Sequence, residues 1–302
     1  MIVRRFERNP IITPHMDDRM GSNINGPSLI RVPDWLPDPL GRYYLYFAHH
    51  KGQYIRLAYA DDLAGPWTPY QEGTLALDQT PCRRHIASPD MHVDHDNRRI
   101  VMYYHGPADP DKAVIKPQLA SRFPSPTGQR SFVATSEDGI HFTSGTEVVG
   151  NSYVRAWQWG DYIYALGGQG RFFRSQDGFH DFVPGPTLFT RDLRHLAVKL
   201  DGDVLTVFYS NAHDCPEHIL ASTVYLTLDW MDWTASDPVS LLKPETEYEG
   251  ANLPLEPSER GWAPEPVRQL RDPCIYVEGE RTYLLYSVAG ESGIAIGEIV
   301  DS

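Results

Sequence analysis

Three carboxylates stand in surroundings that suit general acid–base chemistry. Asp90 follows a proline and precedes an apolar run, Asp272 lies between Arg271 and a proline, and Glu249 lies in a glycine-containing loop that an aromatic residue opens. Acid–base catalysis needs one carboxyl group that is ionised near neutral pH and one that is protonated. The adjacent Arg271 predicts a lowered pKa for Asp272, which suits a base or charge stabiliser. Apolar surroundings predict a raised pKa for Glu249, which suits an acid.

Asp90, Glu249 and Asp272 are therefore the candidate catalytic residues, although each also has a purely structural interpretation. Asp90 and Asp272 could be salt-bridged anchors of a strand, and Glu249 could be a solvated loop residue in the acidic run 245–249. Three further acidic residues are open to the same chemistry: Asp214, Glu217 and Glu291. The choice among them depends on the elements that position them.

The predicted elements are short strands. The 24 glycines and 25 prolines are spread over all 302 residues, and 12% of the residues are aromatic, so turn residues recur between runs rich in Tyr, Val and Ile. This pattern is typical of an all-β protein. Only residues 111–122 look helical, and Pro117 interrupts them, so a helix there is short or broken.

An internal repeat indicates which all-β fold this is. In each copy a polar residue near the start leads into a short apolar strand, then an aromatic-rich strand, then a third strand that ends in an Asp-containing turn. Five unequal copies align on these anchors: Ser28, Asp90, Arg155, His195 and Asp272. Such units predict a propeller rather than a sandwich. We expect one domain over residues 1–302, a five-bladed β-propeller with four-stranded antiparallel blades around a central channel.

Two segments lie outside the repeat. The strand-like segment 2–6 is spare and the fifth copy lacks a fourth strand, so we predict that this segment pairs into the last blade and closes the ring. The second copy carries a long insertion, 105–130, that contains five prolines. Insertions of this length inside a compact domain are usually functional, so we expect this one to wall or cover the mouth of the pocket.

A propeller brings the starts of its inner strands together on one face, so residues far apart in the sequence become neighbours. On this face we place five substrate-binding residues: Asn25, Ser28, Arg155, His195 and Arg271. His195 could also be a neutral hydrogen-bonded group, or a ligand of a channel cation through ordered water. A lone histidine without a second ligand at metal spacing is weak support for a metal, so we expect neither a metal site nor a cofactor.

Arginines are frequent near these strand starts, in a chain that is acidic as a whole. They are Arg83, Arg84, Arg155, Arg194 and Arg271. Because the guanidinium group recognises carboxylates and phosphates in a planar bidentate geometry, the substrate is expected to carry an acidic group. The alternative is that several of these arginines pair with local carboxylates.

The chain resembles the five-bladed propeller glycoside hydrolases of families 43 and 32. The resemblance lies in the blade count, the Asp after a proline at Asp90, the Arg-Asp-Pro triplet at 271–273 and the repeated Ser-x-Asp-Gly turns. The segments NPIIT at 9–13 and NGPS at 25–28 are similar to the start of family 130 sequences. Family 43 implies a base from the first blade, an orienting Asp from the second and an acid Glu from the third. Asp90 matches the second of these, whereas Ser28 stands in place of the base and residues 151–155 contain no Glu.

Composition limits the partners and the compartment. Twenty-seven Lys and Arg against 40 Asp and Glu give a formal charge of −13, which argues against nucleic acid and anionic membranes as partners. The N-terminal residues include no apolar segment of the kind that exports or anchors a chain, and the longest apolar runs are strand-sized. Three cysteines without C-x-x-C spacing indicate neither a disulfide framework nor a zinc site, so a cytoplasmic location is expected.

The resemblance implies a glycoside hydrolase acting on a short or terminal glycoside, or oligosaccharide, by single displacement with inversion. One alternative is phosphorolysis in the manner of family 130, in which bound phosphate replaces water. The other is a non-catalytic sugar-binding propeller, which the unequal lengths of the five copies disfavour. No Gly-rich phosphate loop or Ser/His/Asp grouping gives an oxidoreductase or an esterase comparable support.

Overall fold

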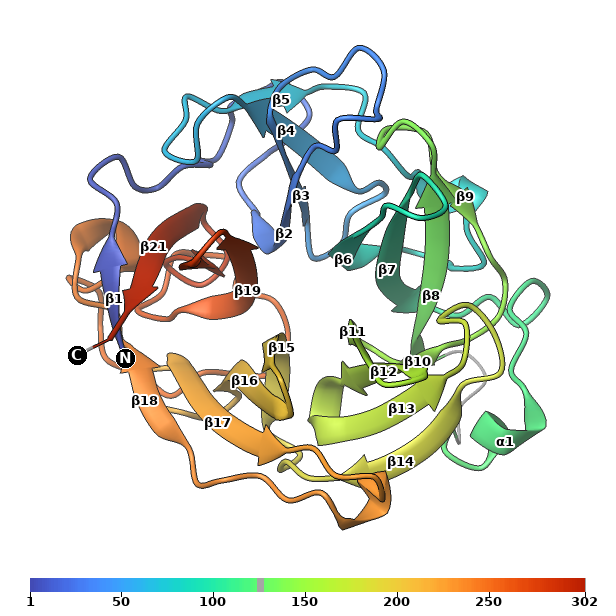
Figure 1. Ribbon diagram of the computed structural model, residues 1–302. Coiled ribbons are helices and arrows are strands. Elements are labelled where there is room, and N and C mark those ends of the chain that lie inside the picture. Colours follow the sequence, from blue (N-terminus) through green and yellow to red (C-terminus); the bar gives the residue numbers. More distant parts are fainter. Residues whose placement is uncertain (124–127, 302) are drawn as a thin grey trace.

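A computed structural model describes residues 1–123 and 128–301 of the chain and shows five antiparallel sheets arranged in a ring (Figure 1). The predicted five-bladed β-propeller is therefore confirmed. The first blade consists of β2 (Asn25–Arg31), β3 (Tyr43–Ala48), β4 (Arg56–Ala60) and β5 (Thr68–Tyr70). The second consists of β6 (Ala87–Asp94), β7 (Arg99–Pro107), β8 (Gln129–Ser136), β9 (Thr143–Ser144) and β10 (Gly150–Asn151).

The remaining three blades each have four strands. The third consists of β11 (Arg155–Trp159), β12 (Tyr162–Gly167), β13 (Arg171–Ser175) and β14 (Val183–Thr187). The fourth consists of β15 (Leu193–Asp201), β16 (Val204–Asn211), β17 (Ile219–Tyr225) and β18 (Val239–Leu242). The fifth consists of β19 (Arg271–Glu278), β20 (Arg281–Ser287), β21 (Ile294–Val300) and β1 (Ile2–Arg5). The second blade departs from the expected four strands because β9 and β10 pair with β8 in succession, as a fourth strand broken in two.

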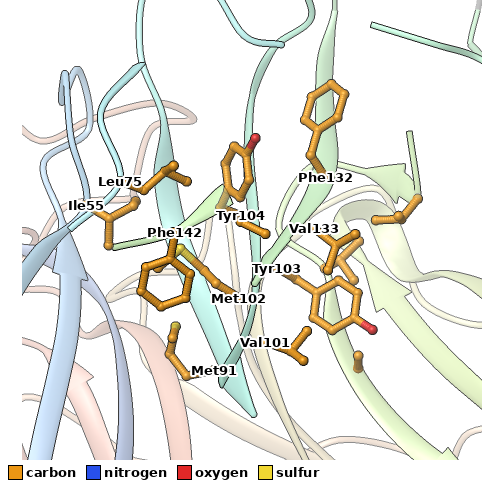
Figure 2. Close-up of a cluster of buried hydrophobic side chains, with 14 of the residues drawn as sticks. Ile55, Leu75, Met91, Val101, Met102, Tyr103, Tyr104, Phe132, Val133 and Phe142 are labelled. Atoms are coloured by element: carbon orange, nitrogen blue, oxygen red, sulfur yellow. The ribbon is translucent and has the colours of Figure 1, made fainter. Parts of the chain in front are cut away.

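The second strands of the blades are the most deeply buried because aromatic and aliphatic side chains on both of their faces pack against neighbouring blades. Every residue of β3 is buried. Figure 2 shows one of these interfaces, where the side chains of Met102 and Phe142 lie next to Ile55 and Leu75 from the segments that flank β4 and β5. Burial of this kind supplies most of the driving force for folding.

The repeated Ser-x-Asp-Gly turns also tie neighbouring blades together. Tyr46 in the first blade donates a 2.7 Å hydrogen bond to the carbonyl of Gly139 in the second-blade turn. Tyr103 in the second blade donates a 2.9 Å hydrogen bond to the carbonyl of Gly178 in the third-blade turn. A Cβ atom on Gly178 would lie 2.9 Å from the Tyr103 hydroxyl oxygen, and its φ of +77° is strained for other residues. The motif therefore places glycine where the Tyr of the preceding blade must approach.

The ring closes as predicted. β1 pairs antiparallel with β21 in the fifth blade, with Ile2 opposite Val300 and Arg5 opposite Gly297. Figure 1 shows β1 and β21 side by side, so that the start of β1 lies beside the end of β21. The N-terminal strand thus covers what would otherwise be an open sheet edge.

The insertion of the second blade runs outward for most of its length. Its short helix α1 (Pro117–Ala120) has its proline in the first turn, where no backbone donor is lost, and contacts β14 at the periphery. Residues 124–127 lie outside the described part of the chain. Of the described insertion residues, His105 and Gln129 at its two ends line the central cavity, so they form part of a wall. No helix in the described ranges is long and apolar enough to cross a membrane.

Candidate active site

Four of the five inner strands have a residue with left-handed backbone close to their first residue. Their φ values are +60° at Gly26, +51° at Ser88, +59° at Tyr153 and +50° at Asp272. In four blades the pairing of the first and second strands also shifts register here, between Asn25 and Ser28, Ala87 and Asp90, Leu193 and His195, and Arg271 and Cys274. Such bulges re-aim side chains, and strained backbone gathers at functional sites. This end of the channel is therefore the candidate site.

A cavity of about 250 Å³ occupies this end of the channel. Its lining comes from all five blades and from the loop before β19: Asn25, His50, His85, Ala87, Ser88, His105, Gln129, Ser152, Tyr153, Arg194, His195, Arg260, Gly261 and Asp272. A second, deeper cavity of about 160 Å³ is lined by residues further along the inner strands, among them Ser28, Asp90, Arg155 and Cys274. We call these the outer and the inner cavity.

The predicted site residues are distributed over three places. Asn25, His195 and Asp272 line the outer cavity. Ser28, Asp90 and Arg155 line the inner cavity. Each lies two or three residues after a residue of the same blade that lines the outer cavity. Arg271 and Glu249 line neither cavity. The structure therefore does not bring the three candidate carboxylates Asp90, Glu249 and Asp272 together.

Asp272 is the carboxyl group of the outer cavity. Its Oδ1 accepts a 2.9 Å hydrogen bond from the Tyr153 hydroxyl, and its Oδ2 accepts a 3.0 Å bond from the Ser287 hydroxyl. Burial, and next the negative charge of Glu291, raise the pKa of Asp272 to about 6 despite these bonds. The expected lowering by Arg271 is wrong, because that guanidinium turns away to other carboxylates. A carboxyl with a pKa near 6 can be protonated when a substrate arrives.

Neutral histidines make up much of the wall. Burial lowers the pKa of His85 to about 4 and that of His105 to about 3. Burial, with Arg194 and Arg271 nearby, also holds the pKa of His195 well below its usual range. The His195 ring packs on Tyr153, with centroids 5.0 Å apart, and its Nε2 lies 3.5 Å from Asp272 Oδ1. These imidazoles are uncharged near neutral pH, so each offers one donor and one acceptor nitrogen.

Two buried arginines behind the wall are balanced by two buried glutamates. Glu217 Oε2 lies 3.3 Å from Arg194 Nη1 and 3.2 Å from Arg271 Nε, and Glu291 Oε1 lies 3.0 Å from Arg271 Nη1. Burial favours the protonated form of Glu291, but the hydrogen bond from His50 and the charge of Arg271 outweigh it and lower its pKa to about 2. These arginines thus pair with local carboxylates, which was the alternative interpretation of their positions.

The same two arginines fix the loop that completes the cavity. Arg194 donates to the backbone carbonyls of Glu259 at 2.7 Å and Gly261 at 2.5 Å, and Arg271 donates to the carbonyl of Gly261 at 3.1 Å. Segment 259–262 has no regular secondary structure, yet Arg260 and Gly261 line the outer cavity. Arg271 therefore acts on the site through this loop, whereas the sequence had placed it among the substrate-binding residues.

Asp90 lines the inner cavity and forms hydrogen bonds and an ion pair with residues around it. Its Oδ2 lies 2.8 Å from His92 Nε2 and accepts a 2.8 Å hydrogen bond from the Ala156 amide, and its Oδ1 lies 3.8 Å from Arg155 Nε. Burial opposes ionisation, but His92, Arg155 and this amide together lower the pKa of Asp90. Ser28 Oγ accepts a bond from the Met91 amide. These contacts hold the inner strands of the first three blades together.

Glu249 lies at the seam where the ring closes. Its carboxylate accepts hydrogen bonds from Arg5 Nε at 2.7 Å and from the Tyr286 hydroxyl at 2.8 Å, and from the amides of Glu245 and Thr246. The raised pKa expected for Glu249 is wrong. Burial alone would raise it, but Arg5, the Glu245 amide and Tyr286 outweigh burial and lower it.

Sequence reasoning missed several residues of the outer cavity. His85, His105, Gln129 and Tyr153 were not among the predicted site residues, although His105 and Tyr153 lie next to predicted strand ends. Tyr153 sits two positions before Arg155, the blade-three anchor at which β11 begins, so it lies in the preceding loop and outside the strand start on which the prediction was based. No group of three or more His, Cys, Asp or Glu side chains in the described ranges is placed to hold a metal ion.

Comparisons with known proteins support the fold and give a relative. The chain is 37% identical over 335 aligned positions to uncharacterized protein R118 of Acanthamoeba polyphaga mimivirus, which covers 98% of this chain and 89% of that protein. No protein-family model matches the chain.

Solved structures of similar fold are glycoside hydrolases. The GH43_1 enzyme from Xanthomonas citri complexed with xylose superposes with a TM-score of 0.61 at 12% identity, covering 98% of this chain and 92% of that one. CoXyl43, a β-xylosidase/α-arabinofuranosidase from a compost microbial metagenome in complex with xylotriose, gives 0.62 at 13% identity over 100% and 96%. A putative glycoside hydrolase from Parabacteroides distasonis gives 0.64 at 13% identity over 99% and 96%. The chain belongs to the same family as the mimivirus protein R118, and its fold is the five-bladed β-propeller of the family 43 glycoside hydrolases.

Proposed function

We propose that this protein cleaves the glycosidic bond of a short or terminal glycoside in the outer cavity, with Asp272 as the proton donor. The observation that carries the proposal is a buried carboxyl group with a pKa of about 6 at the wall of the central cavity. Glycosidic cleavage needs a carboxyl group that is protonated near neutral pH to protonate the leaving oxygen. The neighbours of similar fold support the substrate class, because two of them were solved with xylose or xylotriose.

The polar lining fits an uncharged sugar ring. Sugar hydroxyls both donate and accept hydrogen bonds, and neutral imidazoles and amides match this requirement. Asn25 Oδ1, His105 Nδ1 and His195 Nδ1 are buried and have no hydrogen-bond partner within the described part of the chain. Buried polar atoms without partners are rare, so a bound ligand or water is expected to satisfy them.

The proposed step moves one proton and one bond. The Asp272 carboxyl transfers its proton to the glycosidic oxygen as the bond from that oxygen to the anomeric carbon breaks, and water adds to the anomeric carbon with inversion. Tyr153 and Ser287 keep their hydrogen bonds to the Asp272 carboxylate that forms. Hydrolysis also needs an ionised carboxylate to take the proton of water. Glu217 does not line the outer cavity, so it is the candidate only through His195: the ring takes the proton of water at Nε2 and passes the proton on Nδ1 to Glu217 Oε1, 4.0 Å away.

Phosphorolysis is the second candidate, and the lining itself favours it. Asp272 is the one carboxylate among the described residues that line the outer cavity. Phosphate is an ionised nucleophile and needs no carboxylate base, so one acid would suffice. The sugar-bearing product would then be a glycosyl phosphate rather than a free sugar.

The test is a screen of aryl glycosides and short oligosaccharides with and without inorganic phosphate, with products separated by chromatography. Release of the free sugar without phosphate supports hydrolysis, and phosphate-dependent release of a glycosyl phosphate supports the second candidate. Asp272→Asn is the control for adventitious activity. If the wild-type protein binds sugars but cleaves none under either condition, the protein is a sugar-binding propeller and the proposal fails.

A further inference from the structure

Three cationic residues belong to the lining of the outer cavity or stand next to lining residues in the sequence. Lys51 follows the lining residue His50, Arg84 precedes the lining residue His85, and Arg260 itself lines the cavity. All three residues are exposed. They come from the β3–β4 loop, the loop before β6 and the loop before β19. A positive cluster at this position is notable because the whole chain has a formal charge of −13.

Unlike the arginines inside the wall, these three cationic residues have few negatively charged neighbours. Arg194 and Arg271 share Glu217 and Glu291, so the interior carries no surplus positive charge. At the mouth, no carboxylate of the described residues lies within 4.0 Å of the Lys51 or Arg84 charged nitrogens. Arg260 approaches Asp192 at 3.7 Å, with both side chains about half exposed. Exposed pairs of this kind contribute little, so the three positive charges are left for a ligand.

Two of the three cationic side chains, those of Lys51 and Arg260, are held in place before any ligand binds. Lys51 Nζ lies 3.8 Å from the ring centre of Trp262, a contact that joins the β3–β4 loop to segment 259–262 across the mouth. The same segment is fixed from beneath by Arg194 and Arg271, and Arg260 donates a 2.7 Å hydrogen bond to the Arg191 carbonyl. Prior ordering of this kind lowers the entropy cost of binding.

We propose that Lys51, Arg84 and Arg260 form an anion-binding subsite at the mouth of the outer cavity. The proposal rests on the proposed function, since it places the sugar ring inside and the anion beside the bond that is cleaved. The anion can come from two sources. One is a carboxylate or phosphate group on the leaving group of the substrate, and the other is inorganic phosphate that acts as the nucleophile. Both are recognised by the same forked guanidinium and ammonium donors. The acidic group expected from the sequence is thereby assigned to the mouth and not to the sugar-binding interior.

Binding is measured first, by titrating inorganic phosphate into the wild-type protein and into a triple variant, Lys51→Met, Arg84→Gln and Arg260→Gln, with isothermal calorimetry. Arg31→Gln is the matched control, because Arg31 is an exposed arginine at the opposite end of β2. We expect at least a tenfold weaker Kd in the triple variant and no change in the control. The proposal is overturned if phosphate does not bind the wild-type protein or binds the triple variant equally well.

Turnover then separates the two sources. For one sugar, kcat/KM is compared between a 4-nitrophenyl and a 4-carboxyphenyl leaving group, with and without phosphate. If the anion belongs to the leaving group, the triple variant loses a preference for the carboxyphenyl glycoside that the wild-type protein shows without phosphate. If it is free phosphate, the variant instead raises the KM for phosphate. Failure of every glycoside to react would refute the proposed function while leaving the phosphate-binding result to decide the subsite.

Discussion

The Tyr153 hydroxyl, just before the inner strand of the third blade, donates its hydrogen bond to Asp272 on the inner strand of the fifth blade. The two blades are not neighbours in the ring, so this bond crosses the end of the channel. The orientation and the acidity of Asp272 therefore depend on a blade other than its own. It is this dependence that makes Tyr153→Phe informative.

The pH dependence of activity is the first prediction. If Asp272 must be protonated, kcat/KM falls about tenfold per pH unit above a pH near 6. The hydrogen bond from Tyr153 lowers the pKa of Asp272, so Tyr153→Phe moves this limb to higher pH as well as reducing the rate. If kcat/KM of Tyr153→Phe begins to fall at the same pH as in the wild-type protein, the hydrogen bond from Tyr153 does not set the pKa of the catalytic acid.

The stability of Asp272→Asn is the second prediction. The Asp272 carboxyl titrates at its ordinary value of 3.8 in the unfolded chain and at about 6 in the folded chain. Between these values the folded state binds more protons, so the free energy of unfolding falls as pH rises from about 4 to about 6 and is level above that. Asparagine removes this cost, tolerates the positive φ and can still accept from Tyr153.

Asp272→Asn is therefore expected to be more stable than the wild-type protein above pH 7, by up to about 3 kcal/mol. The gain should shrink steadily between pH 6 and pH 4. Urea unfolding at pH 4.5 and pH 7.5 measures both values. A variant that is destabilised equally at the two pH values would mean that Asp272 ionises as an ordinary surface carboxylate.

Glu249→Gln is predicted to affect stability and to spare activity. Its carboxylate pairs with Arg5 and carries no exposed surface, so the amide leaves Arg5 with only the exposed Glu245 as a counter-ion at the ring closure. Breaking such a pair costs about 3 kcal/mol when the partner stays buried, and less here because Arg5 is partly exposed. Thermal unfolding and kcat/KM are measured together. Loss of activity in a variant of unchanged stability would return Glu249 to the list of candidate acids.

Removal of residues 1–8 should destabilise the protein more than Glu249→Gln does. The truncation removes all of β1, exposes the edge of β21, and also takes away Arg5. Differential scanning calorimetry should show a substantially lower melting temperature for the truncated protein. An unchanged melting temperature would mean that pairing of β1 with β21 contributes little to the closed ring.

The fold was predictable because its signals are local. Alternating strand patterns, aromatic second strands and Ser-x-Asp-Gly turns each lie within a few residues, and the turns proved to join blades through Tyr46 and Tyr103. The extra strand of the second blade was missed because β9 and β10 have two residues each and carry no periodic pattern.

The site was predictable only where a strand start fixed the position. Asn25, His195 and Asp272 line the outer cavity for this reason, whereas the pKa of Glu249 was predicted in the wrong direction because its partner Arg5 is 244 residues away. The pKa of Asp272 was predicted in the wrong direction for a similar reason. Adjacency to Arg271 in sequence suggested an ion pair, but in the structure Arg271 pairs with Glu217 and Glu291.

The most direct test of the central claim is the dependence of the Asp272→Asn rate on the leaving group. A glycoside with an activated aryl leaving group needs little protonation, whereas a natural sugar leaving group needs an acid. General acid catalysis contributes roughly 10²–10⁴-fold, so kcat/KM for the natural glycoside should fall by about that factor and the value for the activated glycoside should fall far less. Equal losses on both substrates, or no loss on either, would contradict the assignment of Asp272 as the proton donor.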